Sequence, residues 1–360
     1  MKTLLITMEY PPFKGGVSNY YENLVKYYPD RENIYVLNNN NKELDNLRAF
    51  FSWRKAFFKV YREIKKNNIK RIIVGHVLPL GTVAYVLSYI LPFKYIVIFH
   101  GLDFSLAKKS PRKRFLLKKI LDRSYKIVAA NSYVADEIVN FSSENKEKIN
   151  VVNPGICLDN YNEEEYDIKA LKNKYGVSSN LVLFSLGRLT KRKGFDATIE
   201  AIDRLSDTDL ENIIYFIAGK GEDEQYLKSI VSDRLRGKVV FLGEIKEEEK
   251  WEFLSLCDIF IMPARNINGD YEGFGIVYLE ANMALRPVIA GLSGGVSDAV
   301  VDGENGLLVN PDNIEEIKDA ILRLMNDNEL RSGLGKKGRE RAISEFSWPK
   351  LIQDMYKIIQ

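Results

Sequence analysis

The chain of 360 residues is poor in cysteine and histidine, with two of each. Cys157 and Cys257 lie far apart and have neither a metal-binding nor a redox spacing. So few cysteines are typical of a protein from a reducing compartment, which predicts the cytoplasm. No group of His and Cys has the spacing of a metal centre, so the sequence predicts no bound metal.

The sequence also lacks the marks of a secreted or membrane-spanning protein. The apolar part of residues 1–7 is too short for a signal peptide and runs into Glu9 without a cleavage pattern. Residues 72–91 are apolar over nearly the length of a membrane span, but His76, Pro79 and Gly81 interrupt them. We therefore expect a buried strand followed by a buried helix in this segment.

The composition that remains is that of a globular protein of about two domains, with 46% hydrophobic and 28% charged residues. The net charge of +3 hides an asymmetry. Residues 1–170 carry 27 lysines and arginines against 18 acidic residues, whereas the remainder carries 25 against 31. A basic first half beside an acidic second half indicates that the first half meets a polyanionic partner.

Short β-branched runs alternate with helical patterns along the whole chain, which predicts parallel sheets. The predicted strands are residues 3–8, 33–37, 71–74, 95–99, 126–130 and 149–152, then 181–186, 213–218, 239–242, 259–262 and 287–290. The charged segment 160–179 has no strand pattern, and we place the interdomain link there. The expected architecture is therefore α/β, with two Rossmann-like doubly wound domains facing a cleft. In such sheets ligands bind at the carboxyl ends of the strands.

The most informative segment is residues 271–280, which read YEGFGIVYLE. Glu272 and Glu280 bracket a glycine-rich turn that opens into a helix near Ile276. A helix start binds phosphate through free backbone N–H groups and a partial positive charge. Carboxylates on either side suit hydroxyl-rich groups such as a ribose and a sugar. The segment therefore predicts a site for a nucleotide sugar.

Other strands of the second half end in turns that suit the same ligand. Arg188 and Lys193 straddle a turn after one strand, and two cations there suit a diphosphate. Glycine-rich turns follow three more strands, at Gly219–Gly221, Gly243–Ile245 and Gly291–Gly295, and backbone groups around Ile245 could read a nucleobase.

The first half carries weaker signals of the same kind. Gly15 and Gly16 precede a helix and permit close approach of a phosphate or sugar. His100 follows a strand, with Asp103 shortly after it, and is placed to hydrogen-bond a sugar hydroxyl. A purely structural role for His100 is the alternative, and His76, also after a strand, is equally compatible with one.

Taken together, these motifs resemble the retaining glycosyltransferases of family 4, which have the GT-B fold of two Rossmann-like domains. The resemblance covers nearly the whole chain and rests on Gly15-Gly16-Val17, His100-Gly101-Leu102-Asp103, Asn153-Pro154-Gly155, Gly187-Arg188 with Lys193-Gly194, Ala218-Gly219-Lys220-Gly221, Glu272 with Glu280, and Phe346-Ser347-Trp348. It implies an N-terminal acceptor domain of residues 1–165 plus about 345–360, because the last helix of this fold returns to the first domain. The donor domain is then residues 170–344.

The resemblance also assigns roles. Arg188 and Lys193 would hold the donor diphosphate, Glu280 the ribose hydroxyls and Glu272 the transferred sugar, while His100 would touch that sugar near its reacting carbon. The remaining donor contacts would come from Gly16, Gly219, Ile245 and the backbone of Phe274, Gly275, Ile276 and Val277. Gly15, Gly16 and Asp103 would lie on the acceptor side. Arg188, Lys193, Glu272 and His100 are the expected catalytic residues.

Residues 271–281 with 291–295 look closest to mannosyltransferases that use GDP-mannose, so this donor is favoured over a UDP-sugar. The family needs neither a metal nor a cofactor for retention. The Asp-x-Asp at Asp207–Asp209, a metal motif in another glycosyltransferase class, precedes a strand and is read as a chance match. Arg286 stands where the family has a small residue, and the sequence does not explain it.

Two basic segments in the first half mix cations with aromatic and aliphatic residues, at 108–126 and 50–71. Such amphipathic helices lie on anionic membranes, and no nucleic-acid motif is present. We expect a peripheral enzyme at the inner face of the membrane with a lipid-linked or oligosaccharide acceptor, in surface polysaccharide or glycolipid synthesis. The alternatives are an ordinary solvated face with a soluble acceptor, a sugar-nucleotide epimerase of the same fold, and a two-lobed sugar receptor.

Overall fold

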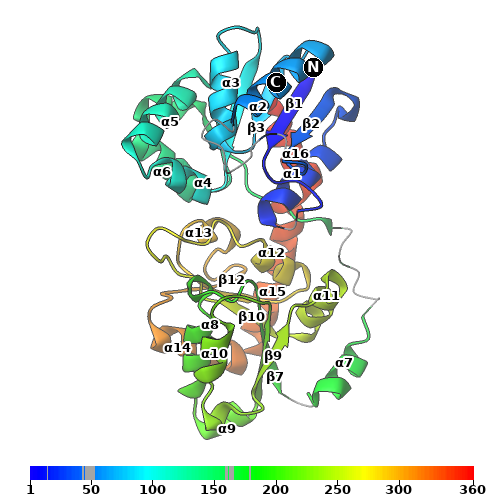
Figure 1. Cartoon of the computed structure of the whole chain (residues 1–360). Helices are drawn as coiled ribbons and strands as arrows, with labels where there is room; N and C mark the ends of the chain where they lie inside the picture. Colours follow the sequence, from blue (N-terminus) through cyan, green and yellow to red (C-terminus); the bar gives the residue numbers. More distant parts are fainter. Residues whose placement is uncertain (14, 43, 45–52, 159–160, 162–165, 178–179) are drawn as a thin grey trace. The chain divides into compact units, whose positions relative to one another are not determined.

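Two parallel sheets of six strands organise the computed structural model, which describes residues 1–13, 15–42, 44, 53–158, 161, 166–177 and 180–360 (Figure 1). Each sheet belongs to its own compact unit. Unit 1 is Met1–Gly155 with Trp348–Gln360, and unit 2 is Ile156–Ser347. The sequence had placed these limits near residues 165–170 and 345.

The sheet of unit 1 has the strand order β2-β1-β3-β4-β5-β6, and every pairing is parallel. Its central strands are apolar and buried along most of their length, as expected for a sheet covered on both faces. The strands are β1 (Thr3–Thr7), β2 (Ile34–Asn38), β3 (Arg71–Val74), β4 (Lys94–Phe99), β5 (Lys126–Ala129) and β6 (Ile149–Val151).

Helices link these strands in the predicted alternation. They are α1 (Gly16–Lys26), α2 (Trp53–Asn67), α3 (Thr82–Leu87), α4 (Leu102–Ala107), α5 (Pro111–Arg123) and α6 (Ser132–Phe141). Residues 72–91, the apolar segment, contain most of β3, a turn over Val77–Gly81 and α3. Within the described residues, no helix combines the length and the hydrophobicity needed to cross a bilayer.

The last helix, α16 (Trp348–Ile359), belongs to unit 1, as the family resemblance implied. The Trp348 ring packs on the ring of Tyr20, with centroids 5.2 Å apart, and Tyr356 packs on Tyr28 at 5.4 Å. The apolar face of α16 is thus buried against α1 and the residues that follow it, so the end of the chain completes the first unit.

The sheet of unit 2 has the order β12-β11-β10-β7-β8-β9, again with parallel pairings. Its strands are β7 (Leu181–Leu186), β8 (Ile213–Ala218), β9 (Val239–Gly243), β10 (Ile259–Met262), β11 (Val288–Gly291) and β12 (Gly306–Val309). The edge strand β12 was not predicted, because its sequence Gly-Leu-Leu-Val has only one β-branched residue.

The helices of unit 2 surround this sheet. They are α7 (Ile168–Tyr175), α8 (Phe195–Asp203), α9 (Asp207–Glu211), α10 (Glu224–Ser229), α11 (Glu247–Leu256), α12 (Ile276–Met283), α13 (Val296–Ala299), α14 (Ile314–Asn326) and α15 (Asn328–Phe346). The segment predicted as a link, 160–179, contains α7. Asp167 caps this helix by accepting from the Ala170 N–H at 2.9 Å, and Gly176 ends it with a φ of 66°.

Candidate active site

The start of helix α12 follows a tight glycine turn. Gly275 is its N-cap and has a φ of 79°, a conformation that strains any residue with a Cβ atom. A Cβ atom at Gly275 would also meet the ring of Tyr278 at 2.3 Å. The first N–H groups of the helix have no partner within it, as at any helix start. The turn therefore presents backbone donors of the kind that bind phosphate, at the residues Phe274–Val277 to which the sequence analysis assigns this contact.

Glu272 and Lys193 lie in contact beside this turn. The Lys193 Nζ is 2.5 Å from Oε2 of Glu272, and the Arg192 Nη1 is 2.9 Å from the same oxygen. Glu272 is buried, which alone would raise its pKa, but Lys193 and Arg192 outweigh the burial and hold the pKa below its usual value. Glu272 is thus a carboxylate at neutral pH, and neither ion pair uses its other oxygen, Oε1.

Glu280 lies farther along α12 and has a cation of its own. The Lys250 Nζ is 2.7 Å from Oε1 of Glu280 and also bonds Glu247 at 2.5 Å. Burial would lower the Lys250 pKa, but the two carboxylates raise it above its usual value, so Lys250 is charged. This buried ammonium fixes the position of the Glu280 carboxylate on the helix.

The other predicted residues of unit 2 follow the carboxyl ends of their strands. Gly219, after β8, has a φ of 131°, and a Cβ atom there would lie 1.9 Å from the carbonyl oxygen of Gly187. Ile245, after β9, is half-buried. Arg188, after β7, is exposed, and its side chain forms no ion pair with any described residue.

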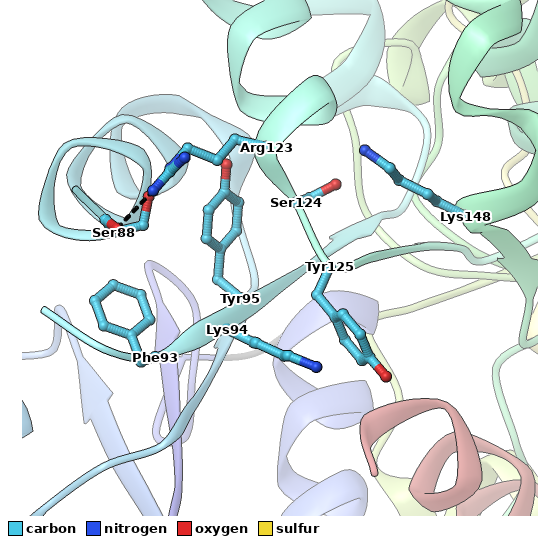
Figure 2. Close-up of a pocket in the computed structure, with 8 residues that line it drawn as sticks. All are labelled: Ser88, Phe93, Lys94, Tyr95, Arg123, Ser124, Tyr125 and Lys148. Atoms are coloured by element: carbon cyan, nitrogen blue, oxygen red, sulfur yellow. Dashed lines mark hydrogen bonds between the residues drawn. The ribbon is translucent and has the colours of Figure 1, made fainter.

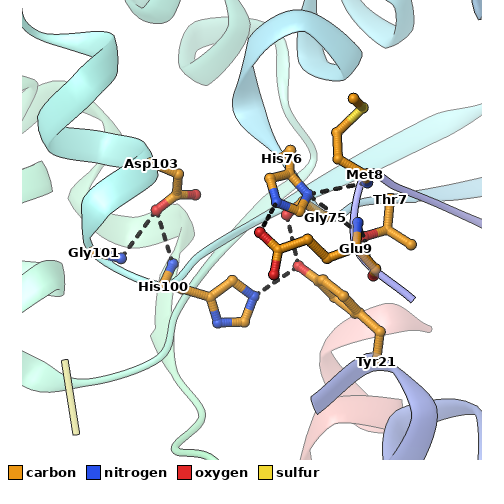
Figure 3. A network of polar contacts seen from close by, with 9 residues as sticks. All are labelled: Thr7, Met8, Glu9, Tyr21, Gly75, His76, His100, Gly101 and Asp103. Carbon is orange, nitrogen blue, oxygen red and sulfur yellow. Dashed lines mark hydrogen bonds and ion pairs between the residues drawn. The ribbon is translucent and has the colours of Figure 1, made fainter. Parts of the chain in front are cut away.

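In unit 1 the residues after β1, β3 and β4 form one polar network (Figure 3). His100 Nε2 is 2.8 Å from the hydroxyl of Tyr21, which donates to the carbonyl of Gly75 at 2.8 Å. A Cβ atom at Gly75 would lie 2.8 Å from the Tyr21 ring, so only glycine leaves room for this contact. Burial and then the charge of His76 lower the His100 pKa to about 3, which keeps the ring neutral.

Asp103 organises the same loop. Its Oδ1 accepts from the N–H groups of His100 and Gly101, at 3.1 and 3.0 Å, and its Oδ2 is buried without a hydrogen-bond partner. Burial raises the pKa of this carboxyl group despite these contacts. The structure thus gives Asp103 a role in shaping the His100 loop, beside the predicted place on the acceptor side.

Gly16, at the start of α1, leaves open space beside the backbone. Gly15 is the N-cap of α1 and Gly16 its first residue, and no atom would lie within 4 Å of a Cβ at Gly16. Close by, the His76 Nε2 faces Glu9 Oε1 at 3.5 Å, and its Nδ1 accepts from the Met8 N–H at 3.3 Å. Glu9, His76 and Tyr21 therefore join the network around His100.

Four of these groups were missed by the sequence. Lys250 and Arg192 touch carboxylates 30 and 80 residues away in the chain, and only the folded sheet brings them together. Arg192 had a partial signal, since it lies in the basic run beside Lys193. Glu9 and Tyr21 had none. In the described part of the chain, no three His, Cys, Asp or Glu side chains gather as metal ligands.

Two family models match the chain, one in each half. "Glycosyltransferase Family 4" matches residues 14–160, and "Glycosyl transferases group 1" matches residues 167–341. An uncharacterized glycosyltransferase of Methanocaldococcus jannaschii, MJ1178, is 29% identical, with the alignment covering 100% of this chain and 98% of the relative.

A second relative has a named reaction. The GDP-mannose-dependent alpha-(1-6)-phosphatidylinositol monomannoside mannosyltransferase of Mycolicibacterium smegmatis is 26% identical over 96% of this chain and 94% of its own. Among solved structures, Anabaena HepE in complex with UDP superimposes with a TM-score of 0.82 at 19% identity, over 99% of both chains. At that identity the likeness shows a common fold.

Proposed function

Because this chain belongs to the family 4 glycosyltransferases, we propose that it moves mannose from GDP-mannose to a lipid-linked or oligosaccharide acceptor with retention of configuration. That it is a glycosyltransferase follows from the family. The donor, the acceptor and the stereochemistry are the proposal.

The observation that carries donor binding is the pair of anchored carboxylates on either side of the α12 start. Glu280, held by Lys250, would accept hydrogen bonds from the ribose hydroxyls. The backbone donors at Ile276 and Val277 would bind phosphate, and Glu272, oriented by Lys193 and Arg192, would bind the transferred sugar. This order of groups matches the order of ribose, diphosphate and hexose along a nucleotide sugar.

The same groups would supply the catalysis. As the bond from the sugar to the diphosphate breaks, negative charge builds on the leaving phosphate, and preorganised positive charge lowers the barrier. Lys193, the exposed Arg188 and the helix start would provide that charge without a metal ion. His100, which is neutral, would accept a hydrogen bond from a sugar hydroxyl and would not donate a proton.

The choice of GDP-mannose is supported by sequence relatives rather than by contacts to a base. The mannosyltransferases of Mycolicibacterium smegmatis and Corynebacterium glutamicum that resemble this chain are named as GDP-mannose-dependent, each at 26% identity. A UDP-sugar donor is the second candidate, because HepE of the same fold was solved with UDP.

The lipid-linked acceptor is supported by the surface of unit 1. On α5 the side chain of Phe115 is 66% exposed among the exposed cations Arg112, Lys113, Arg114 and Lys119. On α2, Phe58 is 62% exposed between Arg54, Lys55 and Arg62. Exposed aromatics within a basic face suit an anionic membrane surface. The predicted residues 50–52 lie outside the described residues.

The donor and acceptor are tested together by a transfer assay. The protein is mixed with GDP-mannose, UDP-glucose or UDP-galactose, with and without a membrane extract, and nucleotide release is followed with product extraction into organic solvent. GDP release that requires the extract, with mannose in the organic phase and no effect of a chelator, is the expected result. Nucleotide release from UDP-sugars alone would favour a UDP-sugar as the donor. Strong inhibition by a chelator would refute metal independence.

Membrane attachment has its own test, co-sedimentation with anionic vesicles at low and high salt. Each cation near the surface contributes about 1 kcal/mol, so reversing Lys113, Arg114 and Lys119 to Glu should abolish binding. Lys118 is spared because it pairs with Glu144. The matched control reverses three exposed lysines of α7, Lys169, Lys172 and Lys174, and should bind like the wild type. If the wild-type protein stays in the supernatant at low salt, these basic faces do not bind membranes and are ordinary solvated surfaces.

A further inference from the structure

A basic pocket of about 420 Å³ lies at the amino-terminal edge of the first sheet (Figure 2). It is built where β4 begins, at Lys94, and just before β5, at Ser124 and Tyr125. The His100 network lies at the carboxyl ends of β1, β3 and β4, which is the opposite edge of the same parallel sheet. The pocket is therefore separate from the His100 network, the part of the candidate active site that lies in unit 1.

Three cations line this pocket, Lys94, Arg123 and Lys148, and its lining contains no carboxylate. All of their contacts are with neutral groups. Arg123 donates to Ser88 Oγ at 2.6 Å and to the Ser88 carbonyl at 2.8 Å. Lys148 donates to the carbonyls of Asp122 at 2.7 Å and Leu121 at 3.3 Å. The Lys94 ammonium lies 4.0 Å from the centre of the Tyr125 ring.

Helix ends explain part of this charge but not all of it. Arg123 and Lys148 bond carbonyls at the ends of α3 and α5, where cations are favoured. Each helix end carries at most about half a negative charge, so two ends offset about one of the three positive charges. Lys94 bonds no helix end. The pocket therefore keeps a net positive charge that no described side chain neutralises by an ion pair.

The neighbouring residues strengthen the case. The Arg71 guanidinium lies 5.1 Å from the same Tyr125 ring, and its buried Nη1 has no hydrogen-bond partner. Asp122, the one acidic group whose charge acts on Lys148, accepts from Asn145 at 2.9 Å instead of pairing with it. Burial lowers the Lys148 pKa, in the direction expected of an ammonium without a counter-ion.

From this geometry we infer that the pocket is a second anion site, which binds a phosphorylated group through Lys94, Arg123 and Lys148. Figure 2 shows the three side chains spread along the pocket rather than meeting at one point, which suits an extended anion such as a diphosphate or a phosphodiester. Arg123 is already oriented by Ser88, and the aromatic residues Phe93 and Tyr125 also line the pocket. The phosphoryl group could belong to a soluble ester or to a lipid headgroup, since Tyr89 and Ile90 beside the pocket are 63% and 59% exposed.

Calorimetric titration with inorganic pyrophosphate at low salt tests the site. The titration is made in the Lys193→Ala background, which weakens diphosphate binding at the proposed donor site. We expect saturable binding that Lys94→Gln weakens at least tenfold and Lys148→Gln weakens as well. Lys94 is exposed and contacts only a ring, so its loss should not disturb folding. The control Lys146→Gln, an exposed lysine outside the pocket, should bind like its parent.

Two results would overturn the inference: no saturable binding of pyrophosphate, or binding that survives both Lys94→Gln and Lys148→Gln. A second arm identifies the source of the phosphoryl group, using phosphatidylcholine vesicles with and without phosphatidic acid. Vesicle binding that pyrophosphate displaces and Lys94→Gln removes would assign the site to a lipid headgroup. Pyrophosphate binding without such vesicle binding would assign it to a soluble phosphate ester. Neither result depends on the identity of the sugar donor.

Discussion

Tyr21 fixes the tautomer of His100. The Tyr21 hydroxyl has one proton, which it donates to the Gly75 carbonyl at 2.8 Å, so its oxygen must accept from His100 Nε2, also at 2.8 Å. The neutral ring therefore carries its proton on Nε2 and presents Nδ1 as an acceptor. If His100 contacts the donor sugar, its Nδ1 accepts a hydrogen bond from a sugar hydroxyl.

Replacing Tyr21 with Phe should release this constraint. The Gly75 carbonyl and the His100 Nε2–H would lose their partner, and each unsatisfied group costs about 1–3 kcal/mol. We expect a loss of about 2 kcal/mol in the free energy of unfolding and a mixture of His100 tautomers in the imidazole ¹⁵N spectrum. With two histidines in the chain, the spectrum can be assigned with a His76→Gln variant. Tyr89→Phe, which removes an exposed hydroxyl, is the control. A pure Nε2–H tautomer in Tyr21→Phe would contradict the assignment.

The half-buried, neutral His100 should make the protein sensitive to mild acid. Its pKa, about 3 in the folded state because of burial and His76, lies below the usual value near 6.5 in the unfolded chain. Between these values the unfolded chain binds more protons, so this contribution to stability is complete above about pH 6.5 and falls by up to about 1.4 kcal/mol per pH unit below it. Urea unfolding at pH 7.5, 6.5 and 5.5 measures the slope. The His100→Gln variant should lose that part of the slope, and equal slopes in the two proteins would argue against a lowered pKa of His100.

Lys193 should matter for turnover more than for folding. Removing one preorganised cation at the leaving group costs roughly a hundredfold in kcat. Glu272 keeps Arg192 at 2.9 Å in the Lys193→Ala variant, so the fold should persist. Lys191→Ala, which removes an exposed lysine of the same turn, is the matched control and should retain its rate. A normal rate of Lys193→Ala at saturating donor would show that the diphosphate is held elsewhere.

Glu280 and Lys250 should have graded effects on nucleotide binding. Glu280→Ala removes the charged acceptor of the ribose hydroxyls, a loss of roughly 1.5–3 kcal/mol in GDP affinity. Lys250→Met leaves the carboxylate but removes its anchor, so we expect a smaller loss, with Lys250 acting as a positioning residue. Calorimetry with GDP compares both with Glu248→Ala, an exposed acidic residue of α11. Undiminished affinity in Glu280→Ala would exclude this carboxylate from the ribose site.

The sequence predicted the sheets well because each strand is a short run of β-branched and other apolar residues, which is a local pattern. All eleven predicted strands are present, and β12 was missed because leucine is not a specific strand signal. Asp207–Asp209 lies in the first turn of α9, before β8, as the sequence predicted; Ser206 caps this helix by accepting from the Asp209 N–H, and Asp207 pairs with Arg234.

Contacts between residues far apart in the chain could not be predicted from the sequence. No local pattern indicates that Lys250 anchors Glu280, that Glu9 faces His76, or that Tyr21 bonds His100. Arg286 is a further example. Its side chain bonds the carbonyls of Leu254 and Ser255, at 3.2 and 2.6 Å, and so caps the end of α11, which explains a residue that the family pattern left unexplained.

The return of α16 to unit 1 has a consequence for biosynthesis. The ribosome synthesises the chain from its amino terminus onward. Every residue of unit 2 is therefore made before α16, the helix that completes unit 1. Until Trp348 and Tyr356 emerge, the rings of Tyr20 and Tyr28, which the finished protein buries, have no cover on that side. During synthesis the segment of unit 2 is thus complete while Tyr20 and Tyr28 of unit 1 still lack their aromatic partners on α16. The unit that is synthesised first is the last to be completed.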